Sequence, residues 1–476
     1  MSQLRKAKQS GRRRRNGAAA PARDRAAPAV PPVVGFVSLG CVKNLVDSER
    51  MLAQVAESGA IISLDESAAD TIVVNTCGFL GAARDEAMAV IAELAERKRR
   101  GELKRIVVAG CLVQRDGEQI RERVPEVDVL VGVHNRADVA RAVWQRPRAA
   151  AVDCYLGDYH AQPWSDQGRL RLTPRHYAYV RISEGCNQRC TFCTIPAIRG
   201  PLHSKSPDEL VAECRELIAD GARELVLIGQ DTTSYGADIG YTPGLAGLLR
   251  RLDGECAGAR WLRLMYVYPT VLTDEILAAI AECQRVVKYI DIPLQHINTR
   301  MLKLMGRRIT RAQTEALLGR IRARIPDVAI RTTMIVGFPG ETEAEFAELL
   351  AFMRDFGFDA AGAFKYSHEP ETPAARLPEP LDEAEKAERY EHFMLTQQEL
   401  ALRAARRRVG RRLEVLVDER QADGAAGRHA GQAPEVDALC LLPGAPRKPG
   451  EFIRAEVIDT QGYDLVVRPT RQRRPR

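Results

Sequence analysis

Short apolar runs alternate with helical patterns over the first third of the chain. Four runs rich in β-branched residues are each followed by a segment whose apolar positions have helical spacing, and the runs lie at residues 33–37, 71–74, 105–108 and 127–130. Strands that alternate with helices predict a parallel sheet joined by right-handed crossovers. We therefore predict one α/β domain over residues 32–147.

A second, longer series of the same kind follows a polar stretch. Residues 148–174 are rich in turn-forming residues, and we predict that they form a linker. Six candidate strands separated by helical patterns follow at residues 177–182, 224–228, 262–266, 287–292, 330–336 and 360–365. This pattern predicts a full or partial (β/α) barrel, whose chemistry lies at the C-terminal ends of its strands. A charged amphipathic helix over residues 381–408 completes a predicted domain at residues 175–408.

The period of the pattern changes after residue 408. Leu413, Val415 and Val417 alternate with polar neighbours, and further short strands are expected near residues 436–442, 452–458 and 463–467. Spacing of two over about sixty residues predicts a small β-barrel at residues 409–470. The predicted fold class is therefore α/β, with an N-terminal parallel-sheet domain, a central partial (β/α) barrel and a C-terminal small β-barrel.

Charge is distributed unevenly along the 476 residues. The formal net charge is +7, but residues 1–30 carry eight more basic than acidic residues and residues 471–476 carry four more, so the body is mildly acidic. We interpret residues 1–31 and 471–476 as disordered basic tails, which can contact RNA nonspecifically. A transit peptide is the alternative for the first tail, but Asp24 and the nearby prolines favour a disordered arm.

Eleven cysteines in a chain of this length are unlike the dense, paired set of a small secreted disulfide scaffold. No run reaches the roughly eighteen apolar residues that a membrane span needs, and the N-terminus lacks the apolar segment of a signal peptide. We therefore expect a reducing cytoplasm and no membrane partner.

Three cysteines form the strongest local signal. Cys186, Cys190 and Cys193 have C-x3-C-x2-C spacing directly after the first predicted barrel strand, where barrel enzymes place their active sites. Three thiolates this close can hold three corners of a [4Fe–4S] cluster and leave the fourth iron open. Zinc and structural thiols are the alternatives, but zinc prefers a fourth Cys or His nearby, and the nearest candidate is His203. The spacing favours the cluster.

Three further cysteines are far apart in sequence but share one position in the predicted fold. Cys41, Cys77 and Cys111 each follow the C-terminal end of a successive strand in the first domain. Parallel strands place these ends along one edge of the sheet, so the three thiols are expected to converge. Isolated buried cysteines are the alternative. The strand argument favours a second cluster with three protein ligands.

The first trio, with Phe192 before its last cysteine, resembles the radical S-adenosylmethionine superfamily. The resemblance implies that the open iron binds S-adenosylmethionine and that one electron cleaves it to a deoxyadenosyl radical. Two turns match the superfamily's cofactor-binding places. Gly229-Gln230-Asp231 follows the second barrel strand, and Gly337 lies in the turn after the fifth strand. The resemblance implies cofactor contacts at these residues; taken alone, either turn is more often only a tight turn.

The segment from Ser38 to Glu49 resembles the opening motif of the methylthiotransferases, whose domain order is a cluster domain, the radical core and a TRAM β-barrel. The resemblance covers roughly residues 33–470. Residues 182–186, 230–236, 293–298 and 433–437 are similar to the branch that modifies small-subunit ribosomal protein S-twelve (uS12) rather than tRNA adenosine. Val42 stands where that branch usually has proline. The resemblance implies a transferase that adds a methylthio group to the β-carbon of an aspartate in uS12.

Charge gives a separate indication of the branch. Residues 411–470 contain ten acidic and eight basic residues, whereas a barrel that grips tRNA should be basic. A basic ribosomal protein is the more suitable partner. A low-potential electron donor such as flavodoxin or ferredoxin is also implied. The alternatives are a tRNA adenosine methylthiotransferase and a noncatalytic iron–sulfur scaffold.

The other chemically capable residues carry weaker signals. We predict that the five remaining cysteines are packing residues, because they lack ligand spacing. His296 and Gln295, at the end of the fourth barrel strand, either line the substrate cavity or are structural. The five cysteines are Cys154, Cys214, Cys256, Cys283 and Cys440.

Overall fold

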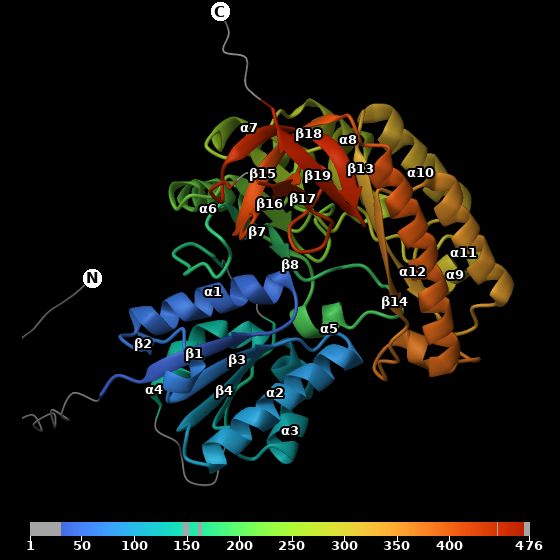
Figure 1. Cartoon of the computed structure of the whole chain (residues 1–476). Coiled ribbons are helices and arrows are strands. Elements are labelled where there is room, and N and C mark those ends of the chain that lie inside the picture. The colour runs from blue at the N-terminus through green and yellow to red at the C-terminus, as the bar shows by residue number, and fades with distance from the viewer. Residues whose placement is uncertain (1–29, 146–151, 160–163, 445, 471–476) are drawn as a thin grey trace, which may run out of the picture. The chain divides into compact units, whose positions relative to one another are not determined.

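The computed structural model describes residues 30–145, 152–159, 164–444 and 446–470 (Figure 1). The two predicted basic tails lie almost wholly outside this part of the chain, as do residues 148–151 and 160–163 of the predicted linker. Among the described residues, no helix has the length and apolar character needed to cross a membrane.

The first domain is built on a parallel sheet of six strands in the order β2-β1-β3-β4-β5-β6. Every residue of β3 and β4 is buried, because helices cover both faces of the sheet. Helices α1 and α4 pack on one face, and α2 and α3 pack on the other (Figure 1). The elements are β1 (Val33–Ser38), α1 (Val42–Glu57), β2 (Ile61–Ile62), η1 (Glu66–Ala68), β3 (Thr71–Thr76), α2 (Gly81–Arg99), β4 (Arg105–Gly110), α3 (Cys111–Arg123), β5 (Val129–Gly132), η2 (Val133–Asp138), α4 (Val139–Trp144) and β6 (Asp153–Tyr155).

Strand β6 lies inside the segment that we predicted to be a linker. It pairs with β5 in parallel, with Cys154 opposite Leu130, so the first sheet extends beyond residue 147. The strand has only three residues, none of them fully buried, and it therefore lacks the apolar pattern that marks a strand in a sequence.

The central domain contains six parallel strands of three to eight residues, in agreement with the predicted partial barrel. They form two sheets, β11-β10-β7 and β12-β13-β14, which a single bridge between Leu262 and Val286 connects. The helices around them enclose the largest apolar core of the molecule. The strands are β7 (Tyr177–Arg181), β10 (Glu224–Ile228), β11 (Trp261–Leu264), β12 (Tyr289–Asp291), β13 (Ala329–Val336) and β14 (Ala360–Lys365), and a short pair is formed by β8 (Ser183–Glu184) and β9 (His203–Ser204).

Helices alternate with these strands, as the crossover pattern requires. Helices α6, α10 and α11 begin with capping boxes, in which a Ser or Thr and a Glu or Gln satisfy backbone N–H groups reciprocally. The helices are α5 (Ile195–Arg199), α6 (Pro207–Ala219), α7 (Gly244–Glu255), η3 (Pro269–Val271), α8 (Asp274–Glu282), α9 (Thr299–Leu304), α10 (Arg311–Arg324), α11 (Glu343–Phe356), η4 (Pro373–Arg376) and α12 (Glu383–Arg406).

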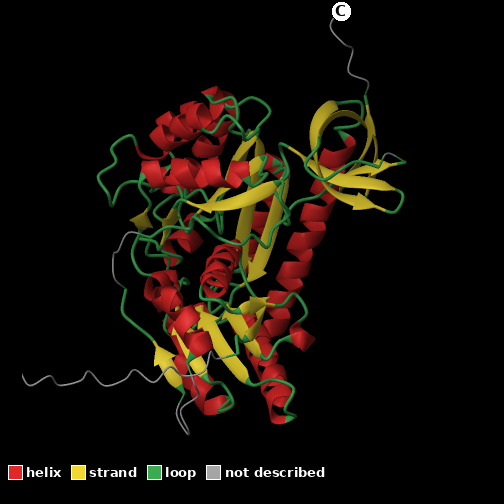
Figure 2. Ribbon diagram, turned by 90° about the vertical axis from the view of Figure 1, so that its left-hand side faces the viewer, coloured by secondary structure: helices red, strands yellow, loops and turns green. Residues whose placement is uncertain are grey.

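The last domain is a closed barrel in the order β15-β16-β17-β19-β18, at the C-terminal end of α12 (Figure 2). Its strands are β15 (Arg412–Gln421), β16 (Gly424–His429), β17 (Cys440–Pro443), β18 (Phe452–Gln461) and β19 (Asp464–Pro469). The sequence pattern missed β16, because that strand begins Gly-Ala-Ala-Gly instead of with β-branched residues. A Cβ atom at Gly427 would lie 2.2 Å from the carbonyl oxygen of Leu416, so the close strand pairing requires glycine there. The predicted fold class is confirmed.

Candidate active site

The first cysteine trio lies on the loop between β8 and α5, at the C-terminal ends of the barrel strands. All three side chains are half-buried. The backbone N–H of Cys186 donates to Gly200 O at 3.2 Å, and that of Cys193 donates to Cys190 O at 3.2 Å. The Gln188 N–H points at the Cys186 sulfur at 3.4 Å. The loop therefore folds back on itself around the three sulfurs.

Gly185 makes this fold possible. Its φ angle is 73°, and a Cβ atom there would lie 2.0 Å from Pro201 O, so glycine is needed for both conformation and space. We expect Gly185→Ala to cost about 1–2 kcal/mol for the left-handed backbone and about 1–3 kcal/mol more for the overlap. The measurements are the unfolding midpoint and the iron bound per chain.

Gly101→Ala is the matched control for that substitution. Gly101 also has a positive φ angle, of 78°, but no atom lies within 4 Å of its added Cβ. This variant should show only the backbone cost and normal iron content. Equal behaviour of the two variants would contradict the role given to the Pro201 contact.

The surroundings of the first trio suit metal ligands better than a nucleophile. Burial raises the pKa of Cys186 and of Cys193 to about 12, so each thiol keeps its proton at neutral pH until a metal replaces it. The Arg307 guanidinium lies 3.7 Å from the Cys190 sulfur and stacks 4.3 Å from the Tyr268 ring. A cation beside three thiols offsets the negative charge that they gain as ligands. The donor set therefore fits an iron–sulfur cluster.

The structure brings the predicted cofactor-binding residues to this loop. Phe192 contacts Phe338, next to Gly337, with ring centroids 6.5 Å apart. Asp231 accepts a hydrogen bond from the Gln188 side chain of the cysteine loop at 2.9 Å. A Cβ atom at Gly229 would lie 2.8 Å from Ser183 Oγ, so glycine lets the turn approach β8.

These residues differ in whether their polar groups are still free to hydrogen-bond a ligand. Asp231 is buried and also accepts from the N–H groups of Thr233 and Ser234, so it mainly holds its own turn and the cysteine loop. The N–H of Gly337 already donates to Glu341 at 2.8 Å. Gln230, by contrast, has a buried side-chain oxygen without a hydrogen-bond partner in the described structure. Gln230 is thus the predicted residue with a free polar group.

The second trio converges as the strand argument predicted. Cys41 caps the N-terminus of α1, Cys77 follows β3, and Cys111 begins α3 after β4. The Asn44 amide donates to Leu39 O at 3.2 Å and to Thr76 O at 2.9 Å, and so joins the ends of β1 and β3. A Cβ atom on Gly40 would lie 2.6 Å from that of Cys77, which shows how closely these ends meet.

The members of this trio differ in exposure: Cys41 is exposed, Cys77 is intermediate and Cys111 is buried. Burial raises the pKa of Cys111 to about 12, and the Cys41 and Cys77 sulfurs lie close enough to add to that effect. The three sulfurs thus share one electrostatic environment, which fits a cluster with an accessible corner.

Arg199 connects the two trios. It is the last residue of α5, directly beyond the first trio, and its Nε lies 3.2 Å from the Cys111 sulfur. The same buried guanidinium donates to Glu184 at 2.6 Å and to Asp47 at 2.8 Å. Sequence reasoning missed Arg199, because no local pattern shows that α5 touches the first domain.

Lys43 was also missed, although it lies within the opening motif. Its side chain is buried between the second trio and the barrel, with Nζ 3.1 Å from the centroid of the Tyr266 ring. Burial lowers the pKa of Lys43 to about 8, with Cys41 acting in the opposite direction. The sequence did contain an indication of this role. Lys43 is two residues from the predicted ligand Cys41, so its positive charge lies close to the predicted cluster.

His296 and the five remaining cysteines carried weaker sequence signals, and the structure gives none of them a place at the two cysteine trios. His296 is fully buried; its Nδ1 accepts from the Asn298 N–H, so Nε2 carries the proton and donates to Glu341 at 3.0 Å. It is a structural histidine. Of the remaining cysteines, Cys214, Cys256, Cys283 and Cys440 are buried, as expected of packing residues, but Cys154 is exposed on β6. The packing interpretation is therefore wrong for Cys154, which lies on an edge strand.

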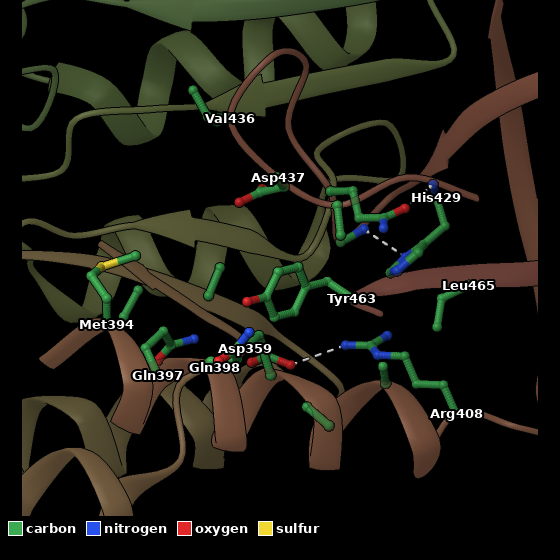
Figure 3. A pocket seen from close by; sticks show the side chains of 18 residues that line it. Asp359, Met394, Gln397, Gln398, Arg408, His429, Val436, Asp437, Tyr463 and Leu465 are labelled. Atoms are coloured by element: carbon green, nitrogen blue, oxygen red, sulfur yellow. Dashed lines mark hydrogen bonds and ion pairs between the residues drawn. The ribbon is translucent and has the colours of Figure 1, made fainter. Parts of the chain in front are cut away.

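Two further observations concern the described residues. In this part of the chain, no three or more His, Cys, Asp or Glu side chains are placed so that together they could bind one metal ion. A cavity of about 410 Å³ lies between α12, β14 and the C-terminal barrel, next to the ion pair of Arg408 with Asp359 (Figure 3). None of the predicted site residues lines it.

Comparison with protein families identifies three regions. Residues 33–132 match "Uncharacterized protein family UPF0004", residues 180–353 match the radical SAM superfamily, and residues 409–469 match the TRAM domain. A protein of Desulforamulus reducens named ribosomal protein uS12 methylthiotransferase RimO is 42% identical over 445 residues, which cover 91% of this chain and 99% of that protein. The chain belongs to the RimO family.

Other members of the RimO family are as similar. The protein of that name from Anaeromyxobacter sp. (strain K) is 43% identical over 448 residues, covering 92% of this chain and 94% of its own length. Among solved structures, the radical S-adenosylmethionine methyltransferase TsrM from Kitasatospora setae matches with a TM-score of 0.52 at 15% identity, covering 72% of this chain and 74% of that one. At this identity, the match shows the fold alone. The family expected from the sequence motifs is confirmed.

Proposed function

We propose that the chain is a transferase that adds a methylthio group to the β-carbon of an aspartate in ribosomal protein uS12. Similarity to RimO proteins over nine-tenths of the chain carries the proposal. Its cofactors are two [4Fe–4S] clusters and S-adenosylmethionine. When bound, these groups would supply a deoxyadenosyl radical that removes hydrogen from an unactivated carbon, and they would supply the sulfur and methyl that replace it.

In this proposal each cysteine trio holds one cluster. Cys186, Cys190 and Cys193 hold the cluster that serves the radical step, with Phe192, Gly229, Gln230, Asp231 and Gly337 around the S-adenosylmethionine. Cys41, Cys77 and Cys111 hold the cluster that serves sulfur transfer. Arg199 fixes the distance between the two centres, because it ends the helix that follows the first trio and donates to a proposed ligand of the second. A short, fixed distance favours transfer over loss of a radical.

In the proposal, the two cysteine trios belong to separate domains. We propose a cluster domain at residues 32–147, a radical core at 175–408 and a TRAM barrel at 409–470, with β6 of the intervening segment added to the first sheet. The 433–437 motif holds the TRAM barrel against the core, since Glu435 accepts from Tyr177 at 2.7 Å and Asp437 accepts from Tyr289 at 2.8 Å. The proposal also includes a flavodoxin or ferredoxin as electron donor, a cytoplasmic setting, and tails that contact RNA nonspecifically.

A parallel assay tests the substrate. Reconstituted protein is incubated anaerobically with S-adenosylmethionine, dithionite and either uS12 or tRNA, and each product is weighed. We expect a methylthio mass increment on uS12 and none on tRNA. The increment on tRNA alone would establish the adenosine-modifying alternative, and the absence of deoxyadenosine in both reactions would leave a noncatalytic scaffold.

A further inference from the structure

Most buried cations between the two cysteine trios have carboxylate partners. Arg199 bonds to Asp47 and Glu184, Arg181 bonds to Asp47 at 2.6 Å, and Arg136 bonds to Glu184 at 2.8 Å. This pairing is the normal condition of buried charge, because an unpaired buried ion loses its hydration without compensation.

Lys43 departs from this rule. Its side chain is 7% exposed, yet among the described residues its Nζ forms no ion pair and no hydrogen bond. Asp291 is a carboxylate within electrostatic range of Lys43, but it is already engaged: it accepts from Arg331 at 2.9 Å and from the Tyr266 N–H at 3.1 Å. The sulfurs of Cys41 and Cys77 also lie within electrostatic range of Lys43, together with the Arg199 cation. The ammonium group therefore has no fixed oxygen partner of its own.

The residue beneath Lys43 is held in a strained conformation. Tyr266 directs its ring face at Nζ and has a φ angle of 59°, a region that costs energy for an aromatic residue. Both of its backbone groups are fixed, the N–H by Asp291 and the carbonyl by the N–H of Thr232 at 3.2 Å. Tyr266 follows β11 and Thr232 follows β10, so this hydrogen bond joins the ends of two barrel strands. The strained backbone and its two hydrogen bonds therefore hold the Tyr266 ring in place beneath the Lys43 cation.

We propose that Lys43 binds the side-chain carboxylate of the aspartate that the enzyme modifies. The inference rests on the proposed function. A carboxylate is the group that an unpaired ammonium lacks, and Lys43 stands beside the cluster that serves sulfur transfer. The β-carbon of aspartate is one bond from its carboxylate carbon, so fixing the carboxylate also fixes the reacting atom. Lys43 is thus a substrate-binding residue that selects aspartate over uncharged side chains.

Arg307 is another buried cation at the site for which the described structure shows no carboxylate partner, and it does not suit this role. Arg307 donates to Pro293 O, stacks on Tyr268 and lies beside Cys190, which places it with the first trio. Lys43 lies across the site, with the second trio. The two cations therefore serve different centres.

A thermodynamic cycle on the loaded enzyme tests the proposal. Binding of labelled uS12 is measured anaerobically by fluorescence anisotropy, with the target aspartate either intact or changed to asparagine. For the wild-type enzyme we expect the asparagine form to bind about tenfold to a hundredfold more weakly. Lys43→Met should weaken binding of the aspartate form by a similar factor and should bind both forms alike. Lys43→Arg, which keeps the charge, should retain the preference for aspartate.

The controls separate the possible failures. Lys104→Met makes the same chemical change at a surface lysine of the same domain and should leave the preference unchanged. If Lys43→Met keeps the wild-type preference, including the case in which it weakens both forms equally, the proposal alone fails. If Lys43→Met and Lys43→Arg both fail to load iron, then Lys43 serves only the cluster and the proposal is overturned. If the wild-type enzyme binds neither form of uS12, the proposed function fails with it.

Discussion

Replacing Cys111 by serine should leave a chain that still cleaves S-adenosylmethionine but transfers no methylthio group. Cys111 is the buried member of the second trio. Because water has little access to this position, it cannot easily take the place of the lost thiolate ligand. We expect iron to fall from about eight to about four atoms per chain, because each cluster contains four irons. Iron analysis, deoxyadenosine formation and the mass of uS12 give the three readouts. The first trio is unchanged, so deoxyadenosine should still form.

Two further variants serve as a comparison and a control for this result. Cys190→Ser should also bind about four irons but should stop deoxyadenosine formation, because it alters the cluster that S-adenosylmethionine contacts. Cys440→Ser is the matched control, since Cys440 is equally buried and its hydrogen bond to Gln432 is one that a hydroxyl can make. That variant should keep all its iron and its activity. Full activity of Cys111→Ser would show that the second trio is not a cluster site.

Replacing Arg199 by methionine should both destabilise the chain and disturb the second cluster. The guanidinium is 1% exposed and bonds to Asp47, Glu184 and Asn44. Its loss removes one cation from a buried network in which, among the described residues, Asp47 and Glu184 keep only Arg181 and Arg136 as partners. Breaking a buried charge network in this way costs about 3–5 kcal/mol. The apo chain should therefore melt at a clearly lower temperature, as followed by circular dichroism.

The same substitution removes a hydrogen-bond donor from the Cys111 sulfur. Donors to the sulfurs are one of the factors that set a cluster's reduction potential, and loss of a cationic donor should lower it. Redox titration followed by electron paramagnetic resonance measures the shift at the second cluster. Arg215→Met is the control, because its ion pair with Glu255 is on the surface, and its effect on stability should stay within about 0.5 kcal/mol. If Arg199→Met matched this control, Arg199 would not connect the two centres.

The sequence by itself determined the architecture and the cysteines that we propose as ligands. The α/β order of the strands was readable, because their apolar runs are long and bounded by helical patterns. Cys186, Cys190 and Cys193 were readable, because a cluster loop is local and its spacing survives in the sequence. Cys41, Cys77 and Cys111 required one geometric rule, that parallel strands end along the same edge. Short elements such as β6 and the glycine-rich β16 were missed, because they lack a hydrophobic period.

Only the tertiary structure decided what surrounds the ligands. Arg199 and Cys111 are 88 residues apart, and their contact depends on how α5 packs against the first sheet. The sequence proposed Asp231 and Gly337 as cofactor contacts, but the fold shows that their polar groups already hold the turns together. Lys43 became informative only when its neighbours were known, because a lysine in a sequence does not reveal whether a carboxylate faces it. Hydrophobic periodicity records which residues are buried, whereas the partners of buried charges come from segments distant in the chain.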